Sequence, residues 1–151
     1  MTKTQEKYKK KGFTLLEVIL SIALIGILAS TFFSVFTNFQ IASDLDLASL
    51  SLVQSLRRAQ LLAQGVSLDS DWGVKIESER IVIFKGAGYA GRDASQDEII
   101  NFPSPLEVSG NTEMVFEKFS GEPDVTGLVA LSTASGTSRE INLNEKGVIS
   151  Y

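Results

Sequence analysis

Residues 12–36 read GFTLLEVILSIALIGILASTFFSVF, an apolar segment that contains one charged side chain, Glu17. From Val18 to Ser43 no charged residue occurs. A helix needs about 20 apolar residues to cross a bilayer, because each residue adds ~1.5 Å to its length. The segment therefore predicts a membrane-spanning helix over residues 13–39.

A short basic segment precedes this helix. Five of the 14 Lys and Arg residues lie within the first eleven positions, and Glu6 is the only acidic residue among them. Positive charge beside a membrane helix favours the cytoplasmic side, so we expect a cytoplasmic amino terminus. Without residues 1–12, nine basic and 17 acidic side chains remain (14 less five and 18 less one), and the net charge falls from −4 to −8.

The residue types that are missing exclude several kinds of site. The chain has 151 residues, of which none is Cys and none is His. Disulfides, thiolate metal sites and Ser-His-Asp triads are therefore impossible. The acidic balance does not favour general binding to nucleic acid. Since no acid–base constellation stands out, we predict a protein that is not an enzyme and that carries no cofactor and no metal.

Glu17 is the residue that an ordinary membrane anchor does not explain. A carboxylate in a membrane helix costs roughly 2.5–3.5 kcal/mol at the bilayer centre and less near an interface, and it usually has a partner or a function. A secretory signal would place small residues after its apolar core as a cleavage site. Here the small residue precedes the core, at Gly12-Phe13.

Lys11-Gly12-Phe13-Thr14-Leu15-Leu16-Glu17 closely resembles the leader junction of type IV pilins and type II secretion pseudopilins. The resemblance implies that residues 1–12 are a cytoplasmic leader, which prepilin peptidase removes by cutting between Gly12 and Phe13. The same enzyme would methylate the new amino group of Phe13. Residues 13–39 would remain as the assembly helix, and Glu17 would pair with the terminal ammonium of a neighbouring subunit.

Two further features of the helix bear on this resemblance. Gly26 coincides with a glycine common in these helices and could permit local flexibility or close packing, although a tolerated glycine in a membrane helix explains it equally well. Many major pilins have a helix-kinking proline in the second half of this segment, whereas this chain has none before Pro103. The absence suits a minor pilin or pseudopilin.

Residues 40–65 keep a helical period but become amphipathic. Gly65 fits a carboxyl-terminal cap, so we expect one helix from Phe13 to Gln64. Arg57-Arg58 could bind phosphate or an acidic neighbouring subunit, or could face solvent near the helix end. Apolar residues at spacings of three and four predict one buried helix face: Ile41, Leu45, Ala48, Leu52, Leu56, Ala59 and Ala63.

Residues 66–151 change to the alternating pattern of β-strands. Residues 72–77 and 80–85 predict a β-hairpin. Further strands are expected at residues 98–102, 106–108, 114–118, 128–132, 139–143 and 148–151. We therefore predict an α+β protein with the pilin-like fold. A long amino-terminal helix, with a membrane-spanning half and an amphipathic half, would pack on a carboxyl-terminal antiparallel sheet domain outside the cytoplasm. Arg57-Arg58-Ala59-Gln60, followed by Trp72-Gly73-Val74, resembles more loosely the GspH/FimT group of minor pseudopilins.

Other motifs in the domain carry less information. Residues 86–91 match G-x-G-x-x-G, but polar residues follow where a dinucleotide site needs an apolar helix. We expect a mobile loop there. Ser132 and Ser138 lack a His base. Several loop carboxylates could offer oxygens to calcium, but they lack EF-hand spacing and are expected to be solvated: Asp69, Asp71, Asp93, Asp97 and Glu98.

The resemblance implies a minor pilin or pseudopilin that is assembled into a type IV pilus or a type II secretion pseudopilus. Its partners would be prepilin peptidase, other subunits and an assembly platform in the membrane. The chain would cross the inner cell membrane once and then join an extracytoplasmic filament. A DNA-binding minor pilin of an uptake system and a membrane-anchored adhesin or binding module remain alternatives. Nucleic acid is the less favoured partner, because only Lys118, Arg139 and Lys146 are basic after Arg92.

Overall fold

The computed structural model describes residues 12–151, except for the side chains of residues 31–35, 37 and 38. Of the predicted leader, residues 1–11 thus lie outside the described residues. The chain divides into two compact units, Met1–Asn38 and Phe39–Tyr151, and each is described by itself. The second unit contains all the strands and the whole hydrophobic core that the described residues form.

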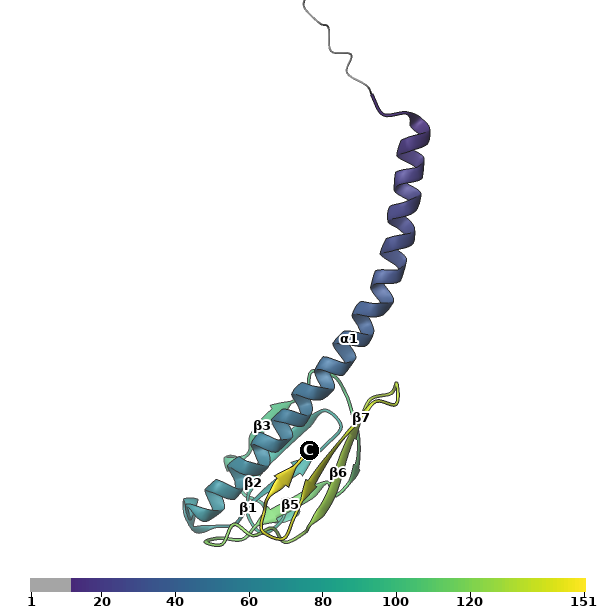
Figure 1. The fold of residues 1–151 in the computed structure, drawn as a ribbon. Helices are drawn as coiled ribbons and strands as arrows, with labels where there is room; N and C mark the ends of the chain where they lie inside the picture. The colour runs from purple at the N-terminus through teal and green to yellow at the C-terminus, as the bar shows by residue number, and fades with distance from the viewer. Residues whose placement is uncertain (1–11) are drawn as a thin grey trace, which may run out of the picture. The chain divides into compact units, whose positions relative to one another are not determined.

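One helix, α1 (Leu15–Gln64), continues from the first unit into the second (Figure 1). It begins two residues later than predicted, because Thr14 stands in front of it as a cap. The predicted end at Gln64 is confirmed. Gly65 donates its N–H to the Leu61 carbonyl at 2.9 Å, but the left-handed residue after the helix is Val66, with φ 53°. Gly65 thus stands directly after the helix, where the sequence placed its cap, while the left-handed conformation falls on Val66.

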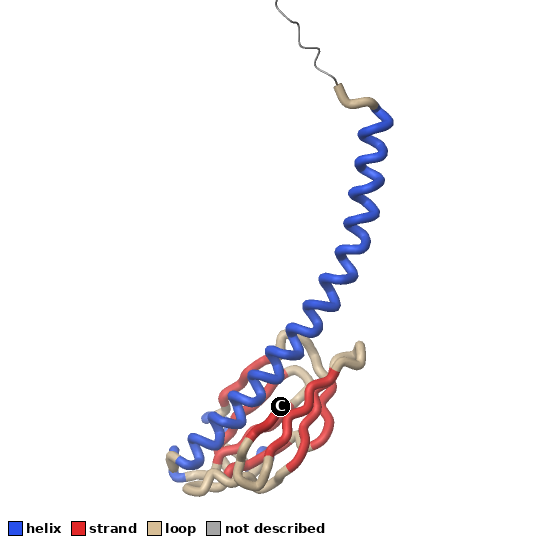
Figure 2. The backbone as a smooth tube through the Cα atoms, in the orientation of Figure 1, coloured by secondary structure: helices blue, strands red, loops and turns tan. Residues whose placement is uncertain are grey.

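Within residues 12–151, eight strands form two antiparallel sheets of four strands each. The order is β3-β2-β1-β5 in the first sheet and β4-β6-β7-β8 in the second. Figure 2 shows the strands of both sheets beside the helix. The bounds are β1 (Trp72–Ile76), β2 (Arg80–Lys85), β3 (Glu98–Asn101), β4 (Glu107–Gly110), β5 (Glu113–Phe116), β6 (Gly127–Ser132), β7 (Ser138–Leu143) and β8 (Ile149–Ser150). This α+β arrangement confirms the predicted fold class and is consistent with the pilin-like fold.

The core of the second unit lies between α1 and both sheets. Every residue of the predicted helix face except Ile41 is fully buried, and Val53 and Ser55 join them. Ile41 is 37% exposed, because the buried part of the helix begins one turn later, at Leu45. Both sheets contribute apolar side chains to the same cluster: Trp72, Val74, Ile76, Ile81, Ile83, Met114 and Phe116 from the first, and Val129, Leu131, Ile141 and Leu143 from the second.

The first sheet is also covered on its other face, by the glycine-rich loop of residues 86–97. Val82 and Phe84 are buried there although they point away from the helix. The Tyr89 ring packs edge-on against Phe84, with 5.5 Å between the centroids, and the Arg92 guanidinium lies 3.8 Å from the Tyr89 centroid. A Cβ at Gly73 would overlap the Phe84 ring, so the ring can lie over residue 73 only because that residue is glycine. The loop thus packs on the sheet through Tyr89, and its mobility stays a prediction.

Candidate processing and assembly site

The junction between Gly12 and Phe13 lies just outside the helix. Gly12, Phe13 and Thr14 are not helical, and Phe13 is 81% exposed. Apart from its chain neighbours, no described residue comes within 4 Å of the position that a Cβ on Gly12 would occupy. Among residues 12–151, nothing therefore shields the peptide bond between Gly12 and Phe13 by packing against Gly12 or by enclosing it in a helix.

Thr14 caps the helix that follows this junction. Its hydroxyl accepts a hydrogen bond from the Glu17 N–H at 3.3 Å, and its carbonyl accepts one from the Val18 N–H at 3.2 Å. Thr14-Leu15-Leu16-Glu17 thus has the spacing of a capping box, S/T-x-x-E. Glu17 lies in the first turn, where the helix dipole favours a negative charge. Sequence reasoning missed the role of Thr14, although this spacing could have revealed it.

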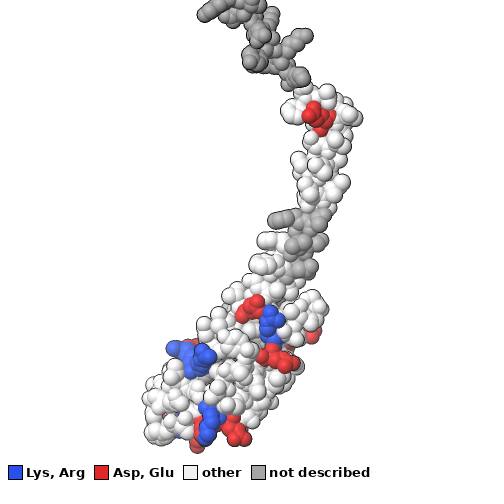
Figure 3. Space-filling model, viewed as in Figure 1, with Lys and Arg blue, Asp and Glu red and all other residues white. Residues whose placement is uncertain are grey.

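The helix around Glu17 is apolar on every side. The large apolar residues described between positions 13 and 28 are 47% to 81% exposed. A helix that is apolar all round is normally buried in a membrane or in a larger assembly. Figure 3 shows this part of the helix as white, apart from acidic atoms near its amino-terminal end. Glu17 is the only charged residue from position 12 to 43 and makes no ion pair with a described residue.

The predicted membrane segment, residues 13–39, lies partly outside the residues whose side chains are described. Within the described residues, no helical stretch combines the length and the apolar character needed to cross a membrane. The helix continues without a break through Gly26, and the space beside this glycine is open. A role of Gly26 in flexibility or close packing stays a prediction.

The two arginines of the basic pair have different surroundings. Arg58 forms two hydrogen bonds with the Glu98 carboxylate at the start of β3, of 2.6 and 2.7 Å. These bonds, and then the attraction of the opposite charges, lower the pKa of Glu98. Arg57 is exposed and makes no hydrogen bond or ion pair with a described residue. Arg58 therefore ties the helix to a sheet edge, and Arg57 alone remains available to a partner.

The loop carboxylates mostly have partners in their own chain. Asp97 pairs with Arg92 at 2.8 Å, Glu98 with Arg58, and Asp69 with Lys118 at 3.0 Å. Asp71 accepts a hydrogen bond from the Lys118 backbone N–H, and Asp93 caps the short turn at residues 94–96. These carboxylates were expected to be solvated; Asp69 and Asp93 are exposed, as expected, and the structure adds that they also have partners in the chain. No group of three or more candidate ligands among the described residues could hold a metal ion.

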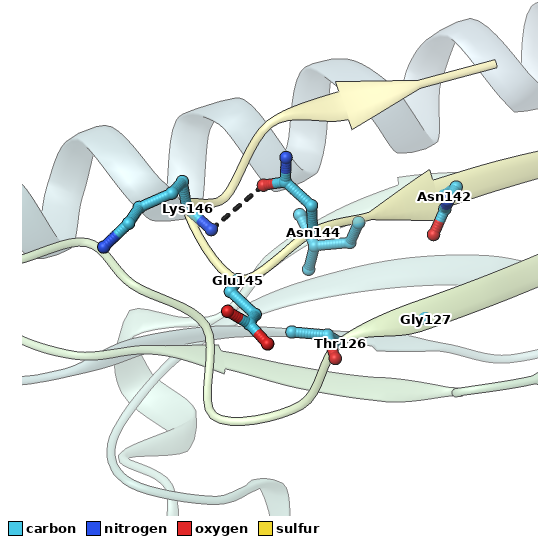
Figure 4. Close-up of a pocket in the computed structure, with 7 residues that line it drawn as sticks. Thr126, Gly127, Asn142, Asn144, Glu145 and Lys146 are labelled. Atoms are coloured by element: carbon cyan, nitrogen blue, oxygen red, sulfur yellow. Dashed lines mark hydrogen bonds between the residues drawn. The ribbon is translucent and has the colours of Figure 1, made fainter.

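A surface depression of about 440 Å³ lies beside the turn between β7 and β8 (Figure 4). The Asn144 side chain accepts hydrogen bonds from the backbone N–H groups of Lys146 and Val148, both at 2.9 Å, and so holds the turn. The Lys146 ammonium is turned to Glu122, at 2.7 Å. These polar groups therefore stabilise the turn and its contact with Glu122. The depression is lined by Thr126, Gly127, Asn142, Leu143, Asn144, Glu145 and Lys146.

A family model described as the prokaryotic N-terminal methylation motif matches residues 7–33. The chain carries a type IV pilin-like amino-terminal signal. The match covers the leader junction, the Thr14 cap, Glu17 and much of the apolar half of the helix. This signal implies processing by a prepilin peptidase and assembly with other pilins, and it indicates a structural protein. No curated protein and no solved structure matches the chain.

Proposed function

We propose that this protein is a minor pilin or pseudopilin, a structural subunit of a type IV pilus or a type II secretion pseudopilus. The observation that carries the proposal is the arrangement at the amino-terminal junction. An exposed Gly12–Phe13 bond lies two residues before a capped helix, and Glu17 is the single charge on the apolar helix surface behind it.

In this proposal the peptidase cuts between Gly12 and Phe13 and methylates the new amino group of Phe13. Glu17 then pairs with the terminal ammonium of a neighbouring subunit. The surrounding apolar helices bury both charges. A buried ion pair is stable only when the two groups are in close contact and their remaining hydrogen-bonding positions are satisfied. The apolar half of α1 anchors the chain in the inner membrane before assembly, with residues 1–12 on the cytoplasmic side. The domain of residues 66–151 lies outside the cytoplasm and joins the filament.

A DNA-binding role fits the described domain less well. Residues 12–151, which include the helix, hold nine basic side chains, of which seven form ion pairs with carboxylates of the same chain, which leaves Arg57 and Lys85. Affinity for DNA depends on cations that are free to neutralise phosphates. A domain with two free cations and an excess of carboxylates would bind DNA weakly, so we place assembly before DNA uptake as the function.

Intact mass of the protein purified from its native cell envelope tests the proposal. We expect the chain without residues 1–12 and with one added methyl group. A chain that still begins with Met1 in cells with an active prepilin peptidase would overturn the proposal. Salt-dependent DNA binding by residues 40–151 would instead favour the uptake function.

A further inference from the structure

The side of α1 that faces away from the sheets carries a stripe of three leucines and two polar residues, which we call the outward stripe. It consists of Leu47, Leu50, Gln54, Arg57 and Leu61, at alternating spacings of three and four. Its three leucines are 52%, 44% and 67% exposed, in that order. The buried residues lie on the opposite side of the same helical turns. An alternating spacing of three and four is the seam along which one helix packs on another.

Arg57 places a positive charge on the outward stripe, and this charge restricts which partner the stripe can bind. It lies one turn before Leu61 and three positions after Gln54, on an otherwise uncharged seam, and no described carboxylate pairs with it. An arginine that becomes buried between leucines needs a carboxylate as its partner, because an unpaired buried charge is strongly destabilising. The partner of the stripe should therefore be an apolar helix with one acidic side chain.

The chain contains such a helix. The described residues 15–30 of α1 are apolar on every side, and Glu17 is their only charge. We propose that the outward stripe of one copy binds the amino-terminal half of α1 of another copy, with Arg57 beside the Glu17 carboxylate. The inference rests on the proposed function, in which every copy crosses the membrane with residues 1–12 on the cytoplasmic side, so that the helices of neighbouring copies run in the same direction. A carboxylate has two oxygens, so Glu17 can accept hydrogen bonds from both the guanidinium and the ammonium of a mature Phe13.

The pairing fixes the register of the two helices. Parallel helices with Glu17 beside Arg57 are offset by 40 residues, roughly 60 Å along the helix axis. Ser21 lies one turn after Glu17, and Leu61 lies one turn after Arg57. Because residues four apart lie on the same helix face, Ser21 of one copy should lie next to Leu61 of the other.

Disulfide cross-linking of the full chain in its native cells tests this register, and the absence of Cys removes background. Ser21→Cys together with Leu61→Cys should give a ladder of multiples of the monomer, because each copy carries both partners. Each single variant, and Ser21→Cys combined with Glu140→Cys on the exposed face of β7, serve as controls and should remain monomeric. In the double variant, Arg57→Glu should lower the cross-linked fraction about tenfold, as expected for a like-charge contact, whereas Arg57→Lys should retain most of it.

The other outcomes count against the proposal. Dimers from Leu61→Cys alone would mean that the stripe meets its own copy, and a ladder of equal strength with Glu140→Cys would mean that contact is unspecific. A double variant that is trimmed and methylated normally but gives no ladder would overturn this inference and leave the proposed function intact. A chain that keeps Met1 would overturn both.

Discussion

Leu50 and Leu52 lie two positions apart on α1, and the same substitution should lower the unfolding free energy strongly at Leu52 and hardly at all at Leu50. Leu52 is fully buried against the sheets, whereas Leu50 is 44% exposed on the outward stripe. Leu→Ala removes three carbon atoms, which at ~0.8 kcal/mol each amounts to about 2.4 kcal/mol of lost burial at Leu52. The cavity left between helix and sheets raises the loss of unfolding free energy to about 3–4 kcal/mol. At Leu50 the same change should stay within about 0.5 kcal/mol.

Urea unfolding of residues 39–151, which contain the whole described core, measures both values. Trp72 is the only tryptophan and is 3% exposed, so its fluorescence reports loss of the core. With a typical urea dependence of about 1–3 kcal/mol per M, Leu52→Ala should lower the midpoint by about 1 M or more. A loss below about 1 kcal/mol for Leu52→Ala, or equal losses for both variants, would refute the assignment of the two helix faces.

Three further predictions concern processing, assembly and pH. Gly12→Leu should leave the chain untrimmed with an unchanged domain, since a side chain at this position would meet no described residue apart from its chain neighbours; intact mass and circular dichroism check the two parts. Glu17→Gln should be trimmed and reach the membrane but should join filaments at less than about a tenth of the wild-type level, measured in sheared filament fractions, because it removes the only charge on the apolar helix surface; wild-type incorporation would contradict the charge-pair role. Arg58 lowers the pKa of Glu98 below its unfolded value of about 4.3. The stabilisation is therefore present above that pH and lost as the pH falls through the folded pKa. Glu98→Gln should make the unfolding free energy less dependent on pH below about 4.3. If the pH dependence in that range were the same as in the wild type, the contribution of the Arg58–Glu98 pair would be disproved.

The sequence allowed the helix and most strands to be predicted, because these depend on local periodicity. The buried face from Leu45 to Ala63 and the hairpin of β1 and β2 follow directly from spacing. The division into two sheets could not be predicted, since it depends on which distant strands pair. β5 pairs with β1, while β6 pairs with β4 and β7, and no short-range pattern records that choice.

The candidate site could be predicted from the sequence because its residues lie close together in the chain. Gly12, Phe13 and Glu17 lie within six positions, and the family signal covers them. Interactions between residues that are far apart in the sequence could not be predicted. The pairing of Arg58 with Glu98 joins residues 40 positions apart. The composition of the glycine-rich loop does not show that Tyr89 packs against Phe84. The exposure of Ile41 was missed for a similar reason, since the helical period does not show where the sheets end.

The Thr14 cap bears on the proposed cleavage. Thr14 accepts a hydrogen bond from the Glu17 N–H within the chain, so this first-turn donor is satisfied without residues 1–12. Under the proposed function, the cut would remove the five leader lysines and leave one ammonium, on Phe13, one residue before the cap. A cation beside the positive end of a helix dipole is unfavourable unless a carboxylate compensates it. In the filament, the Glu17 of a neighbouring copy would supply that carboxylate.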